Sequence, residues 1–313
     1  MSSNQNFFKR DIVSMRDITR KDIEYIMDLS EKMIPYAKGD KTSHPLAGKI
    51  LGNLFFEPST RTRLSFESAA YRLGLNVMDV SQISATSIAK GETLADTIRM
   101  VDTYSDAIVL RHPHEGAARL AANVAESPVI NAGDGAGSHP TQTILDLFTM
   151  KRSKGSIDGL NIALVGDLKY GRTVHSLVDA LTLFGAKLTF VAPDLLQMPQ
   201  DIIDNLKRKG CSPQKTDKIE DIIEEADVLY VTRIQRERFP DPTEYQKVAG
   251  TYRINNEILS QAQSDMIIMH PLPRVDEIAP EVDNTRHAKY FEQAFNGIPV
   301  RMALLCSILG GEM

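Results

Sequence analysis

The most constraining feature of the sequence is a short apolar run followed directly by hydroxyl and arginine side chains. Residues 50–56 have the length and composition of a buried strand, and residues 59–63 read Ser-Thr-Arg-Thr-Arg after a proline-containing turn. Apolar residues then recur at helical spacing as far as Leu73, and Gly74 can end that helix. The segment therefore predicts a strand, a tight turn and a helix that begins near Ser59.

The first turn of that helix has the chemistry of an anion site. Backbone N–H groups at a helix start lack partners within the helix, and the helix dipole is positive there. The three hydroxyls and two arginines beside these donors favour a dense anion such as phosphate. The alternative is a capped surface helix in which Arg63 pairs with Glu67 four residues later. This segment taken alone leaves both interpretations open.

Length and charge narrow the choice of partners. A chain of 313 residues predicts two domains. The formal net charge of -5 argues against nucleic acid as the main partner. An anionic substrate would then be held by local positive clusters against the overall sign of the charge.

The two cysteines and the N-terminal residues indicate in which cellular compartment we expect the protein. Cys211 and Cys306 are far apart and lack metal-ligand spacing, as expected in a reducing cytosol. Residues 1–9 contain no apolar signal core, and no apolar run is long enough to cross a bilayer. We expect a cytoplasmic protein with no metal site of its own.

Strands alternate with helices along the chain, which predicts α/β domains with mostly parallel sheets. A polar segment at residues 151–156 separates two such halves. We expect two doubly wound domains, each a sheet flanked by helices. The predicted strands after the first are residues 77–80, 107–110, 129–131, 161–165, 187–192, 227–232 and 266–269, and one predicted helix covers residues 219–225.

Functional groups in parallel sheets collect at the carboxyl ends of strands. By this rule residues 59–63, Arg111 and the glycine-rich stretch 131–142 lie on one rim of the first sheet. His139 and Gln142 are three residues apart at a helix start, so both can face one point. A lone histidine is commonly structural, but the arginines on the same rim favour a functional role for His139.

Two more arginine sites follow strands of the second half. Residues 166–173 resemble a Walker A loop, but Arg172 stands where that loop requires lysine, and the dinucleotide fingerprint is absent. Arg172 is better explained as a clamp for a carboxylate or phosphate. Arg233 and Gln235 would point the same way in an extended segment, although charged runs of this kind are usually solvated loops.

One anion site in each domain implies a reaction that joins two anionic small molecules in the cleft between the domains. No metal-ligand cluster, nucleophile elbow or activated cysteine is apparent in the sequence. The chemistry would then depend on positioning and on stabilising charge in the transition state.

Five segments, in order along nearly the whole chain, resemble the signature set of the aspartate/ornithine carbamoyltransferases. They are Ser59-Thr60-Arg61-Thr62-Arg63, Lys90-Gly91-Glu92-Thr93, Arg111-His112-Pro113, His139-Pro140-Thr141-Gln142 and His270-Pro271-Leu272-Pro273-Arg274. The likeness is closest to the catalytic chain of the aspartate enzymes. Ornithine enzymes typically carry a cysteine where Pro271 stands, and the second-half arginines suit a dicarboxylate better than a cationic amino acid.

The resemblance implies transfer of the carbamoyl group of carbamoyl phosphate to the α-amine of L-aspartate, in de novo pyrimidine (UMP) biosynthesis and without a cofactor. It implies a carbamoyl-phosphate-binding domain at residues 1–140 and 292–313 and an aspartate-binding domain at residues 141–291. A homotrimer is expected, and a separate zinc-containing regulatory chain is a candidate partner. The alternatives are carbamoylation of another amine such as ornithine, and a non-catalytic anion-binding protein of this fold.

The resemblance also assigns roles to individual residues. The catalytic set is Arg61, Thr62, Arg111 and His139. Carbamoyl phosphate would be bound by Ser59, Thr60, Arg61, Thr62, Arg111, His139, Gln142 and the backbone of Leu272 and Pro273. L-Aspartate would be bound by Lys90, Arg172, Arg233 and Gln235. Ser87 and Lys90 would reach the site of a neighbouring subunit, and Glu57, Arg172 and Arg238 would pair when the domains close.

Overall fold

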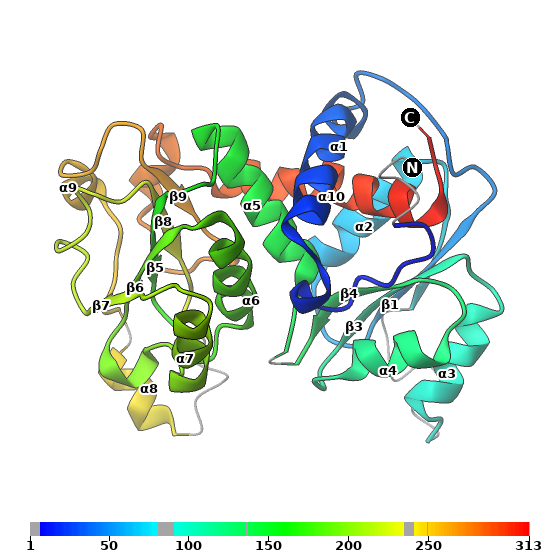
Figure 1. Cartoon of the computed structure of the whole chain (residues 1–313), viewed down its shortest axis with the longest axis horizontal. Helices are drawn as coiled ribbons and strands as arrows, with labels where there is room; N and C mark the ends of the chain where they lie inside the picture. The colour runs from blue at the N-terminus through cyan, green and yellow to red at the C-terminus, as the bar shows by residue number, and fades with distance from the viewer. Residues whose placement is uncertain (1–6, 81–90, 136, 235–240, 249, 313) are drawn as a thin grey trace. The chain divides into compact units, whose positions relative to one another are not determined.

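The computed structural model describes residues 7–80, 91–135, 137–234, 241–248 and 250–312. The chain divides into two compact units, Met1–Leu145 with Phe295–Met313 and Asp146–Ala294 (Figure 1). Both boundaries fall inside helices, namely α5 (Pro140–Lys154) and α10 (Tyr290–Leu309). No helix in the described part of the chain is long and apolar enough to span a membrane.

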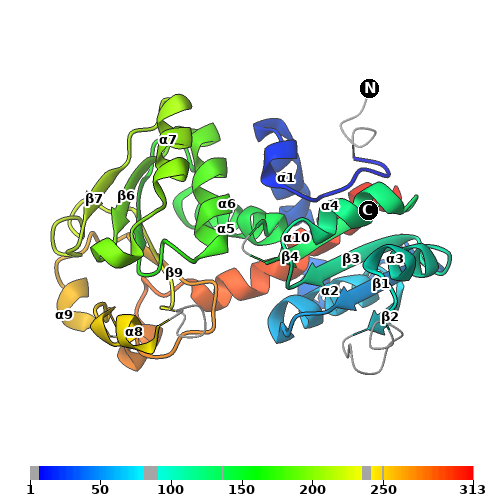
Figure 2. The ribbon, with the colours of Figure 1, turned by 90° about the horizontal axis from the view of Figure 1, so that it is seen from below.

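The first unit contains a parallel four-stranded sheet in the order β2-β1-β3-β4. Helices α3 and α4 cover one of its faces and α2 lies on the other (Figures 1 and 2). Most residues of β1, β3 and β4 are buried, as expected of parallel strands covered on both faces. The elements are α1 (Arg20–Lys38), β1 (Ile50–Phe55), α2 (Thr60–Arg72), β2 (Asn76–Val80), α3 (Leu94–Asp102), β3 (Ala107–His112), α4 (Ala117–Val124) and β4 (Val129–Asp134).

The second unit contains a parallel five-stranded sheet in the order β7-β6-β5-β8-β9. Helices α6 and α7 lie on one side of it (Figure 1), and a cluster that includes Ile223, Tyr252 and Leu259 packs on the sheet. Its elements are β5 (Asn161–Val165), α6 (Arg172–Leu181), β6 (Lys187–Val191), α7 (Gln200–Arg208), β7 (Gln214–Thr216), β8 (Val228–Val231), α8 (Pro242–Val248), α9 (Asn256–Leu259) and β9 (Ile267–Met269). Short 3₁₀ helices lie at Met15–Asp17, Thr182–Phe184, Asp194–Leu196 and Pro280–Asn284.

Two parallel sheets flanked by helices confirm the predicted fold class. Two local predictions differ from the structure. Residues 219–225 were expected to be a helix but form consecutive turns, which nevertheless bury Ile219 and Ile223 as the apolar spacing indicated. Strand β7 was not expected, because its residues Gln-Lys-Thr are polar and largely exposed at the sheet edge.

In each sheet the strand order reverses at one point, between β1 and β3 and between β5 and β8. At these switch points Phe55 pairs with Arg111, and Val165 pairs with Val231. Ligands in open α/β sheets bind beyond the carboxyl ends of the two strands at such a point. The topology therefore predicts that the residues following these four strands form the ligand sites.

Gly166 directly follows β5, at a switch point where the packing leaves no room for a side chain. Its φ is +110°, and an added Cβ would collide with the backbone carbonyl of Thr232, whereas Gly185 at φ +61° has nothing within 4 Å. We expect Gly166→Ala to lower the free energy of unfolding by about 2 kcal/mol more than Gly185→Ala, because only the first adds overpacking to backbone strain. Urea unfolding of both variants measures this difference, and equal losses would contradict it.

Candidate functional site

Helix α2 begins at the β1 end of the first switch point without the usual capping groups. Ser59 occupies the N-cap position but makes no side-chain capping hydrogen bond, and the first turn contains no acidic residue. In ordinary surface helices a serine at this position bonds to an N–H of the first turn. The donors at this helix start are therefore not satisfied by Ser59, which favours the anion-site interpretation.

The two arginines of this segment differ in their surroundings. Nη1 of Arg63 lies 3.2 Å from Oε1 of Glu67 and 2.7 Å from Oδ2 of Asp79 on β2. The guanidinium of Arg61 makes no hydrogen bond or ion pair with any residue that the structure describes. Although the side chain keeps much of its exposure, partial burial lowers its pKa. A partly desolvated cation with no carboxylate partner gains most from an incoming anion, which favours Arg61 over Arg63.

Arg111, the fifth residue of β3, is buried and held on two sides. Its Nη1 donates to the carbonyl of Ala132 at 3.1 Å, and its Nη2 lies 3.0 Å from Oε2 of Glu57. Because Arg111 pairs in register with Phe55, the turn after β1 brings Glu57 within reach. This ion pair thus connects the end of β3 to the turn after β1 at the first switch point.

Asp134, the last residue of β4, fixes the loops around it. The buried carboxylate accepts hydrogen bonds from Nδ2 of Asn131 at 3.0 Å, the N–H of Ser138 at 3.0 Å and the N–H of Gly116 at 2.9 Å. Gly135 has φ +50°, and a Cβ there would lie 2.8 Å from the carbonyl of Pro113. The loops after β3 and β4 are therefore tied together. No role was predicted for Asp134, because two of its partners, Gly116 and Ser138, lie on separate loops.

His139 follows these loops and precedes α5. Its side chain is buried, and its carbonyl accepts the N–H of Gln142 at 3.0 Å. The predicted pair His139 and Gln142 therefore occupies one turn at the helix start, three residues apart.

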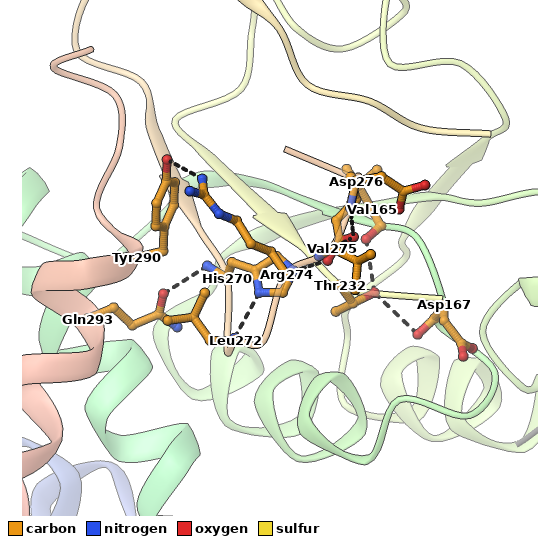
Figure 3. A network of polar contacts seen from close by, with 11 residues as sticks. Val165, Asp167, Thr232, His270, Leu272, Arg274, Val275, Asp276, Tyr290 and Gln293 are labelled. Atoms are coloured by element: carbon orange, nitrogen blue, oxygen red, sulfur yellow. Dashed lines mark hydrogen bonds and ion pairs between the residues drawn. The ribbon is translucent and has the colours of Figure 1, made fainter. Parts of the chain in front are cut away.

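In the second unit, Thr232 joins the two strand ends of the switch point. Its hydroxyl lies 3.0 Å from the carbonyl of Val165 at the end of β5 and 3.4 Å from that of Asp167 (Figure 3). Asp167 in turn accepts the N–H of Tyr170 at 2.9 Å, which shapes the turn leading to the buried Arg172 at the start of α6. Arg233 directly follows Thr232, so both predicted arginines come from segments that Thr232 anchors.

The segment after β9 is held by its own side chains. The N–H of His270 donates to Oε1 of Gln293 at 2.8 Å, and the N–H of Leu272 donates to Nδ1 of His270 at 2.8 Å (Figure 3). The sequence did not single out Gln293, which lies on α10, and no local pattern points to it. Four predicted site residues, Ser87, Lys90, Gln235 and Arg238, lie outside the described residues.

Arg274 ends this segment and has a structural partner. Both of its terminal nitrogens bond to the carboxylate of Asp283, and Nη1 also lies 3.0 Å from the hydroxyl of Tyr290. The guanidinium lies over the rings of Tyr290 and Phe291, 5.0 and 5.5 Å from their centroids. Arg274 therefore closes a clamp within the second unit, in contrast to Arg61.

Two family models cover most of the chain. Residues 10–152 match the aspartate/ornithine carbamoyltransferase carbamoyl-P binding domain, and residues 158–308 match the Asp/Orn binding domain of the same family. The chain belongs to the aspartate/ornithine carbamoyltransferases. The resemblance predicted from the five sequence segments is thereby confirmed.

Relatives within this carbamoyltransferase family are similar over nearly their whole lengths. The aspartate carbamoyltransferase catalytic subunit of Methanocella arvoryzae is 58% identical over 98% of this chain and 100% of its own. The catalytic subunit of M. jannaschii aspartate transcarbamoylase is 53% identical with a TM-score of 0.90, covering 96% of this chain and 98% of its own. The Trypanosoma cruzi aspartate transcarbamoylase, solved with carbamoyl phosphate and aspartate, is 43% identical with a TM-score of 0.92, covering 97% and 98%.

The pairing of Arg274 with Asp283 predicts that the stability of this carbamoyltransferase falls at low pH. The hydrogen bonds from Arg274 hold the pKa of Asp283 below its ordinary value of about 3.8. A depressed carboxylate pKa stabilises the fold above the unfolded-state value, and this contribution is lost as the pH falls through the folded-state value. We expect Asp283→Asn to lower the thermal midpoint equally near pH 7 and pH 5, and by less near pH 3.

The matched control for this experiment is Asp265→Asn. Asp265 also pairs with a cation, Lys154, but its side chain is largely exposed. Exposed pairs contribute little, so this variant should change the midpoint only slightly at every pH. A loss for Asp283→Asn that stays constant down to about pH 3 would contradict the assignment.

Proposed function

We propose that this family member is an aspartate carbamoyltransferase, a transferase of one-carbon groups that acts in de novo pyrimidine biosynthesis. It would transfer the carbamoyl group of carbamoyl phosphate to the α-amine of L-aspartate, giving N-carbamoyl-L-aspartate and phosphate. The observation that carries the proposal is Arg61, a partly desolvated cation at the uncapped start of α2 beside a switch point. The full-length similarity to aspartate enzymes supports the choice of acceptor.

In this proposal the first unit supplies most ligands of carbamoyl phosphate. Ser59, Thr60, Arg61 and Thr62 bind the phosphate, since helix-start N–H groups and a guanidinium both favour a dianion. Arg111, His139 and Thr62 polarise the carbamoyl carbonyl. Gln142 and the backbone of Leu272 and Pro273 hold the carbamoyl amino group.

The reaction needs no group beyond these side chains and the two substrates. The neutral amine of aspartate attacks the carbamoyl carbon, and the C=O electron pair moves to oxygen to give a tetrahedral oxyanion near Arg111 and His139. Collapse reforms the carbonyl and breaks the C–O bond to phosphate, which leaves with the electron pair. Phosphate can accept the proton that the amine releases. Preorganised donors at the oxyanion would supply the main stabilisation of the transition state.

The second unit would supply ligands of aspartate. Arg172 and Arg233, with Gln235 and Lys90, bind the two carboxylates, because guanidinium groups match carboxylates in bidentate fashion. Ornithine carries a cationic side chain, which these arginines would repel. In the structure Glu57 pairs with Arg111. We propose that on domain closure it joins Arg172 and Arg238.

We further propose the domain roles, assembly and location. Residues 1–140 with 292–313 form the carbamoyl-phosphate domain, and residues 141–291 form the aspartate domain. The catalytic chains form a cytoplasmic homotrimer, in which Ser87 and Lys90 reach the neighbouring site. The naming of relatives as catalytic subunits supports an oligomer. A separate zinc-containing regulatory chain is a candidate partner.

A two-acceptor assay tests the proposed reaction. Purified protein with carbamoyl phosphate should form carbamoyl-aspartate from L-aspartate and no detectable citrulline from L-ornithine, measured by colorimetric ureido analysis. Citrulline formation would overturn the choice of acceptor. Phosphate binding with neither product would instead identify a non-catalytic anion-binding protein.

The contrast between the two arginines of α2 predicts a second outcome. Arg61→Gln should lower kcat/KM for carbamoyl phosphate by about 10²-fold, the effect of losing a charge-assisted hydrogen bond to a desolvated phosphate. Arg63→Gln, its matched control, should stay within about threefold, because Arg63 already pairs with Glu67 and Asp79. Steady-state kinetics at saturating aspartate decide this, and equal losses in both variants would contradict the assignment.

A further inference from the structure

A chain of buried hydrogen bonds runs from the core of the second unit to the backbone of Leu272. The hydroxyl of Tyr230 on β8 donates to Oδ2 of Asp146 at 2.8 Å, and Nε2 of Gln293 donates to Oδ1 of Asp146 at 2.6 Å. Gln293 then accepts the N–H of His270 at 2.8 Å. These three side chains and that of His270 are almost fully buried. Each polar group in such a network is costly to leave unsatisfied, so the network specifies one arrangement.

The contacts of His270 fix which ring nitrogen carries the proton. Nδ1 lies 2.8 Å from the N–H of Leu272, which can only donate, so Nδ1 must be the acceptor. Nε2 lies 2.7 Å from Oε1 of Glu277 and therefore carries the hydrogen. His270 is thus held as the neutral Nε2–H tautomer, with one nitrogen facing a backbone donor and the other facing a carboxylate (Figure 3 shows the Leu272 side of this contact).

Glu277 is itself anchored in its charged form. Its Oε2 accepts the N–H groups of Val275 and Asp276, both at 3.1 Å. Burial raises the pKa of Glu277, but the hydrogen bonds from His270 and the backbone outweigh burial and leave the pKa below its ordinary value. A carboxylate that stays ionised keeps the His270 proton on Nε2. The loop of residues 270–277 is therefore closed on itself by the His270–Glu277 pair.

The backbone that this loop presents has an unusual conformation. Leu272 has φ +57°, in the left-handed region that residues with a Cβ rarely adopt. Such strained positions persist where surrounding contacts determine them, and they gather at ligand sites. The Leu272 N–H donates to the ring of His270, two residues earlier, and this hydrogen bond constrains the strained residue.

We propose that His270 is a positioning residue for the carbamoyl group. Through Nδ1 it fixes the Leu272 backbone, and this backbone selects a ligand with an amino group on its carbonyl carbon. Glu277 and Gln293 act through His270 and touch no substrate. The inference rests on the proposed function, in which the backbone of Leu272 and Pro273 holds the carbamoyl amino group.

Two substitutions test the roles of the two ring nitrogens of His270 separately. In His270→Asn the side-chain oxygen can still accept the N–H two residues later, as in an Asx turn, while the contact with Glu277 is lost. In His270→Gln the longer amide can still donate to Glu277, while the acceptor for Leu272 is lost. His287→Gln is the matched control, because His287 is a buried histidine of the same unit that bonds the carbonyl of Met266 at 2.7 Å.

The readout is the discrimination between two stable probes that differ only in the group on the carbonyl carbon. Phosphonoacetamide carries an amino group there, and acetonylphosphonate carries a methyl group. Calorimetric titration gives the ratio of their dissociation constants for each variant. This ratio does not depend on the fraction of protein that is active, so a merely structural defect leaves it unchanged.

We expect His270→Gln to reduce the preference for phosphonoacetamide by about fivefold or more, the effect of a lost hydrogen bond. His270→Asn and His287→Gln should keep the wild-type ratio within about twofold. If His270→Gln does not fold, His270→Ala takes its place and should also reduce the preference, because it too leaves the Leu272 N–H without its acceptor.

An unchanged ratio in His270→Gln, or in His270→Ala where that variant replaces it, would overturn the positioning role. An equal fall in His287→Gln would do the same. The wild-type assay with aspartate separates these outcomes from failure of the proposed function. Carbamoyl-aspartate formation together with an unchanged ratio rejects only the inference about His270, whereas absence of the reaction rejects the proposed function itself.

Discussion

The candidate site of each unit depends on the reversal of strand order in its parallel sheet. Where neighbouring strands send their connections to opposite faces, the space beyond their carboxyl ends is left open to a ligand. In the first unit this point lies between β1 and β3, and in the second between β5 and β8. Glu57 pairs with Arg111 at the first point, and Thr232 bonds across the second. Each unit thus positions its polar groups with contacts of its own.

The internal ion pairs distinguish Arg63 and Arg274 from Arg61. Arg63 and Arg274 each bond a carboxylate of the same unit, and these pairs hold α2 to β2 and the loop after β9 to the segment before α10. Arg61 has no such partner among the described residues. In a chain of net charge -5, which repels anions at long range, short-range recognition of an anion requires a local cation such as Arg61.

The sequence predicted those features that depend on neighbours along the chain. Strand ends, the helix start at Ser59 and the arginines beside them follow from apolar periodicity and residue chemistry within about a dozen positions. Strand β7 was missed because its residues are polar, and residues 219–225 form turns despite their helical spacing. Asp134 and Gln293 could not be predicted, since their importance comes from contacts between segments that are separate in the sequence. Gln293, for example, meets His270 across 23 positions of sequence.

The division of the chain has a consequence for its biosynthesis. The first unit needs residues 295–313, whose helix buries Arg301 against the ring of Phe66, with the guanidinium 4.8 Å from the ring centroid. Residues 146–294 of the second unit are continuous. During translation from the N-terminus, the second unit can therefore complete its core while the first still lacks a helix. The part of the chain that leaves the ribosome first can finish folding only after the last helix is made, and until then its apolar surface is exposed to aggregation or chaperones.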